Sequence, residues 1–93
     1  MVLDISHNPE KHRFSAVVEG HECELDYRLA GSVMTITHTG VPEAVGGRGI
    51  AAMLMRAALA EAEARGWKVV PACSYALAFM RRHHEFEYLR LET

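Results

Sequence analysis

A glycine-rich segment, Val41 to Ala51, most constrains what this chain can fold into, because it joins a strand-like segment directly to a strongly helical one. Its glycines, Gly46, Gly47 and Gly49, allow close approach to a ligand and backbone conformations that other residues avoid. The helix that follows begins with unpaired N–H groups and the positive end of its dipole, so a phosphate or pyrophosphate can bind there. Arg48 adds a charge-assisted donor. A tight turn that only packs a strand on a helix is the alternative interpretation.

The composition is that of an ordinary globular protein, and 93 residues predict one domain over residues 1–93. The net charge of −2 argues against a general nucleic-acid or membrane-surface binder, so neither partner is expected. Cys23 and Cys73 lack the spacing of a zinc or redox site, and the six histidines lack metal-ligand spacing, so no metal is predicted. No signal-like or membrane-spanning stretch is recognised, which favours the cytoplasm. A monomer or weak dimer is expected at this size.

The first half of the chain predicts an antiparallel meander of three strands. Residues Arg13 to Val18 favour a strand, and from Glu22 to Leu29 apolar and charged residues alternate, as in a strand with one solvated face. A third strand, rich in β-branched residues, is expected from Val33 to Thr39. The links between these strands are too short for a helix, so we predict hairpin turns.

The second half predicts two helices and one more strand. Apolar residues recur at helical spacing from about Gly47 to Arg65, and Gly66 is predicted to end that helix. The run Trp67 to Pro71 predicts a buried strand, parallel to the third strand through a right-handed crossover. A second helix is expected over Ser74 to His83, and Phe86 to Leu91 can form a short edge strand. The expected fold class is therefore α+β, a mixed α/β domain with one β-helix-β crossover.

This order of elements resembles the core of the GNAT superfamily, the acyl-CoA-dependent N-acyltransferases. The superfamily signature, Q/R-x-x-G-x-G/A, falls on Gly46 to Ala51, where Gly49 and Ala51 match and Gly46 replaces the usual glutamine or arginine. More closely, the chain resembles the very small, single-motif branch often described only as predicted acetyltransferases. The residues that carry this likeness are His38-Thr39, Val41-Pro42, Gly47-Arg48-Gly49-Ile50-Ala51, Pro71-x-Cys73-Ser74-Tyr75 and Arg81-Arg82-His83.

The resemblance implies an enzyme that takes an acetyl group from acetyl-CoA, its cosubstrate, to an amine of unknown identity. It implies that coenzyme A lies along Thr39, Val41, Gly46, Gly47, Arg48, Gly49, Ile50, Ala51 and Arg82. Arg82 can equally belong to a charged helix end that the helix dipole favours. In larger relatives two helices between the first strands help to form the acceptor pocket, and here Glu19-Gly20-His21 is expected to replace them. The resulting open acceptor side suits a small amine or an exposed amine of a macromolecule.

Three residues are candidates for the chemistry, which needs an unprotonated amine, a stabilised oxyanion and protonation of the departing thiolate. Cys73 opens the second helix, where the helix dipole favours a thiolate, and it could carry the acyl group or act as acid and base. His38 could be the general base, although alternation along its strand places it on the face of Met34 and Ile36. Tyr75 could donate a hydrogen bond to the thiolate. Core packing is the alternative interpretation for all three.

The acid that the superfamily often uses is missing from this chain. Aligning Ala76 and Phe79 with the pattern N-x-x-A-x-x-F-Y puts Met80 in place of the tyrosine and Cys73 in place of the asparagine. This loss favours a second hypothesis, a non-catalytic module that binds coenzyme A or acyl-CoA as a sensor or carrier. A small interaction domain that keeps only the fold is a third.

Overall fold

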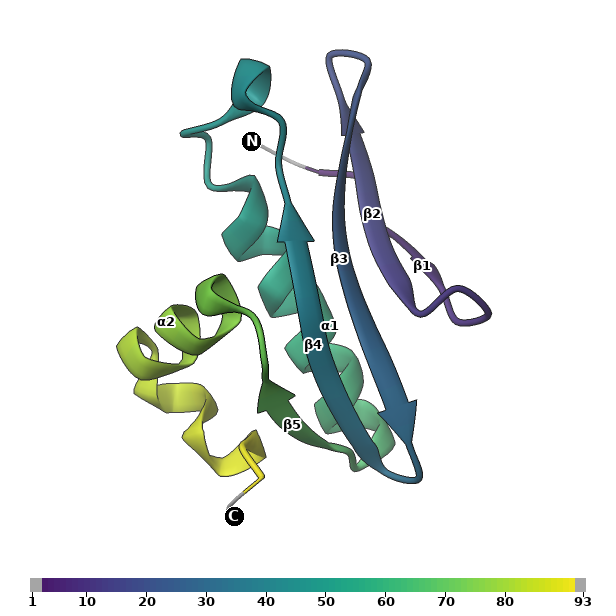
Figure 1. Cartoon of the computed structure of the whole chain (residues 1–93), viewed down its shortest axis with the longest axis vertical. Helices are drawn as coiled ribbons and strands as arrows, with labels where there is room; N and C mark the ends of the chain where they lie inside the picture. Colours follow the sequence, from purple (N-terminus) through teal and green to yellow (C-terminus); the bar gives the residue numbers. More distant parts are fainter. Residues whose placement is uncertain (1–2, 92–93) are drawn as a thin grey trace.

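The computed structural model describes residues 3–91, which form one sheet with helices packed against it (Figure 1). The strands lie in the order β1-β2-β3-β4-β5, antiparallel from β1 to β4, with β5 parallel to β4. The predicted α+β class, meander and parallel strand are confirmed. In chain order the elements, with η for a 3-10 helix, are β1 (Ser6–Asn8), β2 (Arg13–Val18), β3 (His21–Ala30), β4 (Val33–Gly40), η1 (Glu43–Val45), α1 (Ile50–Arg65), β5 (Lys68–Pro71), α2 (Ser74–Arg82) and η2 (His84–Leu89).

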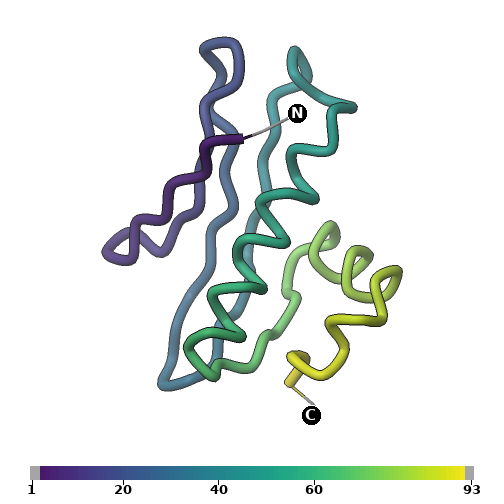
Figure 2. Tube along the Cα trace, turned by 180° about the vertical axis from the view of Figure 1, so that it is seen from behind, coloured from purple at the N-terminus to yellow at the C-terminus, as the bar shows by residue number. Residues whose placement is uncertain are grey.

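One face of the sheet is buried because apolar side chains alternate with polar ones along the strands. Helix α1 lies across this face (Figure 2). Gly66 ends α1 in the left-handed conformation, as its sequence position predicts. The side chains shared by one core cluster include Phe14, Leu25, Tyr27, Met34 and Ile36 of the strands, Leu54, Met55 and Leu59 of α1, and Phe79 and Met80 of α2. No helix in residues 3–91 is long and apolar enough to cross a membrane.

The C-terminal segment corrects one prediction. Instead of an edge strand over Phe86 to Leu91, the chain forms the 3-10 helix η2, and Arg90 alone makes an isolated parallel bridge to Val69. The reason is the three-residue spacing of Phe86 and Leu89, which a 3-10 turn places on one side. Leu89 is buried in the core cluster, and Phe86 packs against it.

A short strand that the sequence did not predict, β1, forms the edge of the sheet, with His7 opposite Phe14 of β2. Its three residues are polar, so no apolar alternation marks it. Because β1 precedes β2, the link between the first two strands is residues 9–12. The expectation that Glu19-Gly20-His21 fills that place is therefore wrong, since this turn joins β2 to β3.

An aromatic stack holds β1 on the sheet. The His7 ring lies parallel to the Phe14 ring with centroids 4.0 Å apart, and His7 Nε2 is 2.6 Å from the Tyr27 hydroxyl. His7 Nδ1 is 3.9 Å from a Glu61 carboxylate oxygen. Burial lowers the pKa of His7; Glu61 opposes this shift, and the positive charges of Arg65 and His12 add to it.

We expect the free energy of unfolding to fall at acidic pH because of His7. Its pKa in the folded protein is below its ordinary value of 6.5, so below that pH the unfolded chain binds more protons. The stabilisation is fully present above pH 6.5 and is lost as the pH falls through the folded pKa. Urea unfolding at several pH values should show a steeper acid decline for the wild type than for His7→Phe, which keeps the ring stack. Identical pH dependence of the two proteins contradicts this assignment.

Candidate functional site

The glycine loop lies between η1 and α1 and leaves the start of α1 open. Gly47 and Gly49 both have φ of +76°, in the left-handed region. This delays α1 to Ile50, three residues after the predicted start. No side chain of the described residues caps α1, and the first bond of its ladder runs from the Met53 N–H to the Gly49 carbonyl oxygen over 3.1 Å. The preceding N–H groups of the helix therefore remain for an anion.

Glycine is required at different positions of the loop for different structural reasons. A Cβ built on Gly47 or Gly49 meets nothing within 4 Å, so these two residues face open space. A Cβ on Gly46 would lie 3.3 Å from the Glu43 carbonyl oxygen, and Gly46 has φ of −68°. Gly46 therefore accommodates the close approach of η1, whereas Gly47 and Gly49 leave room beside the helix start.

Two residues predicted to bind the cofactor have side chains turned into the protein. Ile50 is 2% exposed and belongs to the core cluster, so only its N–H group can serve a ligand. Val41 is half-buried and packs against the same cluster. Ala51 is half-buried and lies in the first turn of α1. The loop therefore offers mainly backbone donors.

The side chain of Arg48 has a partner within the protein. Its Nη1 donates to a Glu19 carboxylate oxygen over 2.5 Å, which connects the loop to the tip of the β2–β3 hairpin. The hydrogen bond from Arg48 lowers the pKa of Glu19. In this arrangement the Arg48 guanidinium is engaged by Glu19.

A pocket of about 340 Å³ opens between α1 and α2. It begins where the loop ends, since Ala52 stands in the first turn of α1. Burial raises the pKa of Tyr75, although the guanidinium groups of Arg56 and Arg82 oppose this, so Tyr75 is a neutral phenol at pH 7. The lining residues are Ala52, Tyr75, Ala78, Phe79, Arg82 and His83.

The pocket brings Tyr75 and Arg82 together, both of which are predicted site residues. The sequence did not single out Ala52 and Ala78. Alanine is the best helix former, so an alanine in a helix carries no sign that it lines a pocket. Only the three-dimensional arrangement of α1 and α2 identifies these two positions.

Cys73 and Thr39 meet where β5 separates from β4. The register of these strands ends at Ile36 opposite Pro71, and both the Ala72 and the Cys73 N–H groups then donate to the Ile36 carbonyl oxygen, over 2.9 and 3.1 Å. Thr39 Oγ1 is 3.7 Å from the half-buried Cys73 Sγ.

Cys73 also has a structural role, because it is the N-cap of α2. Its Sγ accepts a hydrogen bond from the Ala76 N–H over 3.4 Å. The prediction that Cys73 opens the second helix is thus confirmed. The contact with Thr39 and the position at the divergence of two strands make it the best placed of the three candidates.

His38 lies on the opposite face from the one that alternation predicts. The register between β3 and β4 shifts at Asp26 and Tyr27, which pair with His38 and Ile36, so Thr37 is an extra residue in β4. Beyond this bulge the alternation of β4 is reversed: Thr39 pairs with buried Leu25, and His38 becomes exposed. The expectation that His38 shares a face with Met34 and Ile36 is wrong, since nothing in the sequence marks the bulge.

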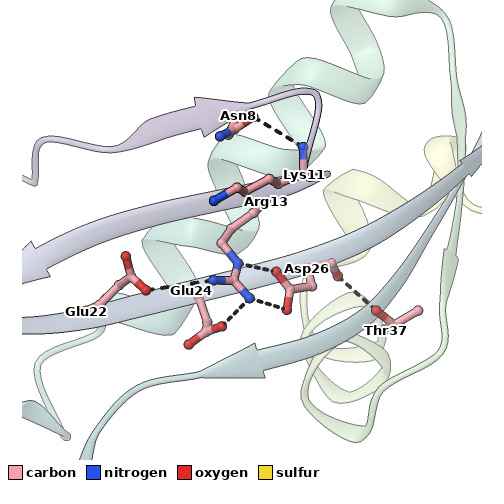
Figure 3. A network of polar contacts seen from close by, with 7 residues as sticks. All are labelled: Asn8, Lys11, Arg13, Glu22, Glu24, Asp26 and Thr37. Atoms are coloured by element: carbon pink, nitrogen blue, oxygen red, sulfur yellow. Dashed lines mark hydrogen bonds and ion pairs between the residues drawn. The ribbon is translucent and has the colours of Figure 1, made fainter.

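On this outer face Arg13 holds two strands together (Figure 3). Its Nε donates to Asp26 over 2.6 Å, and its Nη2 is 2.8 Å from a Glu24 carboxylate oxygen. Glu24, Asp26 and His38 each place one possible metal ligand within 4.8 Å of the others. Because the Arg13 guanidinium already engages both carboxylates, we assign this cluster to the pairing of β2 and β3.

Residues 13–89 match the sequence profile of the GCN5-related N-acetyltransferases. The chain belongs to this family. The match includes the glycine loop, the pocket and Cys73, so the whole candidate site lies within the GNAT region. The likeness to the GNAT superfamily that the loop indicated is confirmed.

A solved structure shows the same GNAT fold. The solution structure of a GCN5-like protein from Staphylococcus aureus superposes with a TM-score of 0.78, at 23% identity, over 98% of this chain and 90% of that one. At this identity the likeness establishes the fold alone. Among curated proteins no relative matches the chain.

Proposed function

We propose that this single GNAT domain transfers an acetyl group from acetyl-CoA to an amine, in the cytoplasm. The observation that carries the proposal is the continuity between the uncapped start of α1 and the pocket between α1 and α2, which share Ala52. A ligand whose pyrophosphate binds the helix start and whose phosphorylated end enters the pocket, where Arg82 lies, fits such a shape. Coenzyme A has this chemistry.

The acyl end would lie where β4 and β5 diverge. Residues 37–40 of β4 continue beyond the last pair with β5, so that edge of the strand is free to bond an extended, amide-containing arm. Such an arm leads to the contact between Thr39 and Cys73. The free edge and this contact support placement of the thioester there.

The residues around this point can perform acyl transfer. The amine nitrogen attacks the thioester carbonyl, the C–S bond breaks, and the thiolate of coenzyme A takes a proton from Tyr75 or Cys73. If Cys73 acts as a nucleophile, the acyl group passes first to its sulfur and then to the amine. The amine loses its proton to solvent, because His38 lies on the outer face of β4, opposite the contact between Thr39 and Cys73, and is not placed to act as the base. Arg82 is available to a phosphate at the far end of the pocket.

A second function, binding of acyl-CoA without turnover, is favoured by one observation. Met80 stands where the superfamily often has its acidic tyrosine. Its side chain has no ionisable proton and is completely buried, so it cannot replace that acid. Intact mass of the protein and of a panel of amines after incubation with acetyl-CoA separates the two functions. An acetylated amine supports the transferase, and binding with no acetylated product supports the carrier.

Replacing Gly49 by alanine is expected to weaken coenzyme A binding about tenfold. The new Cβ would enter the open space beside the helix start, where we place the pyrophosphate. Gly66→Ala is the matched control, because Gly66 has φ of +73°, an equally open Cβ position and a place at the other end of α1. Both changes impose similar backbone strain, of about 1 kcal/mol.

Calorimetry with coenzyme A measures the affinity, and urea unfolding measures the strain. The proposal expects similar losses of stability for the two alanine variants and weaker binding for Gly49→Ala alone. Equal affinities of Gly49→Ala and Gly66→Ala would remove the loop from the cofactor site. If the wild-type protein binds no coenzyme A, both coenzyme A functions fail, and the hypothesis of an interaction domain that keeps only the fold remains.

A further inference from the structure

The tip of the β2–β3 hairpin stands at the same end of the molecule as the glycine loop, in both views of the chain (Figures 1 and 2). Glu19 at this tip is bound to Arg48 of the loop. We propose that Glu19 holds Arg48 in the free protein and gives it up to the phosphates of coenzyme A, so that Glu19 sets the affinity of the cofactor site. This inference rests on the proposed function, and it makes Glu19 a positioning residue that acts through Arg48.

The backbone of Glu19 is unusual for its residue type. Glu19 and Gly20 form the two-residue link after the last pair of the hairpin, Val18 with His21, and their φ angles are +50° and +79°. A turn with positive φ at both central residues favours asparagine, aspartate or glycine at the first of them. A glutamate there is held in a sparsely populated conformation, which persists where the surroundings or a function require it. The bond to Arg48 is the interaction that this glutamate makes.

Arg48 is the only cationic residue between Val41 and Ala51. The superfamily signature usually has a glutamine or arginine at the position of Gly46, so within this segment Arg48 is the residue that can add a charged donor to the backbone N–H groups. It lies between two glycines, Gly47 and Gly49, whose Cβ positions are open, so its side chain has room to turn. A loop of this kind allows one arginine to bind first the Glu19 carboxylate and then a phosphate of the cofactor.

The pair between Glu19 and Arg48 is suited to exchange. The side chain of Arg48 is 34% exposed and that of Glu19 is 63% exposed, so water screens the pair and it contributes little to stability. A pyrophosphate carries more charge and more acceptor oxygens than one carboxylate and forms stronger bonds with a guanidinium group. The carboxylate therefore reduces cofactor affinity without blocking binding.

Glu19→Gln is expected to bind coenzyme A about threefold more tightly than the wild type, because the neutral amide competes less for Arg48. The same substitution in an Arg48→Ala background should leave the affinity unchanged. Glu10→Gln removes an equal charge from an exposed residue of the turn between β1 and β2, and it should bind as the wild type does. Calorimetry gives the affinities, and thermal unfolding should show no change for Glu19→Gln.

Each other outcome overturns the inference. Equal tightening in the presence and absence of Arg48 would show general repulsion between Glu19 and the cofactor. Unchanged or weaker binding by Glu19→Gln in a protein that binds coenzyme A would show that Glu19 does not compete, and this leaves the proposed function intact. If neither the wild type nor any variant binds coenzyme A, the proposed function fails and the inference fails with it.

Discussion

Replacing Cys73 by serine is expected to lower acetyl-CoA turnover about a hundredfold while the fold is retained. Serine is a favoured N-cap, so its hydroxyl can accept the Ala76 N–H bond that Cys73 Sγ accepts in the wild type. Its hydroxyl is a far weaker nucleophile and acid than a thiol, so the chemistry suffers although the geometry survives. The measurement is the rate of release of free coenzyme A with a panel of amines, compared between Cys73→Ser and the wild type.

Comparison with Cys73→Ala distinguishes the chemical role of the thiol from its role as the N-cap of α2. This variant loses both, and we expect it to match Cys73→Ser in turnover but to lose about 1 kcal/mol more of the free energy of unfolding. Urea unfolding of the two variants gives the comparison. If Cys73→Ser turns over acetyl-CoA at the wild-type rate, the thiol takes no part in the chemistry, and Tyr75 remains as the proton donor.

Replacing Ile36 by alanine is expected to cost about 2–5 kcal/mol of the free energy of unfolding. Ile36 is 0% exposed and lies in β4 between Tyr27 of β3 and Pro71 of β5. Truncation leaves a cavity in the centre of the sheet, beneath α1. A domain of this size has only about 5–15 kcal/mol in total, so the variant should unfold at markedly lower urea concentration.

Val17→Ala is the control for this substitution. Val17 lies in β2 on the outer face and is 68% exposed, so its truncation removes little buried surface. A loss below about 1 kcal/mol is expected for it. Comparable losses at the two positions would contradict the assignment of β4 to the centre of the core.

Alternation and helical spacing predicted most of the fold because they record which side of each element is buried. They identified β2, β3 and both long helices, where apolar residues repeat over several turns or pairs. They could not predict β1, whose polar residues gain their strand conformation from pairing with β2 and from the stack of His7 on Phe14. They misassigned the C-terminal segment, because a short apolar pattern does not distinguish a strand from a 3-10 helix.

The candidate site was predictable where the backbone requires a particular residue. Gly47 and Gly49 have positive φ, and Cys73 begins a helix after a strand, so their types and positions pointed to these places. His38 was placed on the wrong face because one extra residue, Thr37, reverses the alternation of β4 without any mark in the sequence. The partner of Arg48 was also unpredictable, since Glu19 is distant along the chain and only the folded hairpin brings them together.

The central claim is that coenzyme A binds with its pyrophosphate on the start of α1, and backbone amide NMR tests it directly. Titration of coenzyme A into the wild-type protein should shift the amide signals of residues 47–52 most strongly, with the pocket residues of α2 next, and the shifts should saturate together. Absence of shifts would contradict the claim. So would shifts centred on the second pocket, which Lys68, Glu87, Tyr88, Arg90 and Leu91 line.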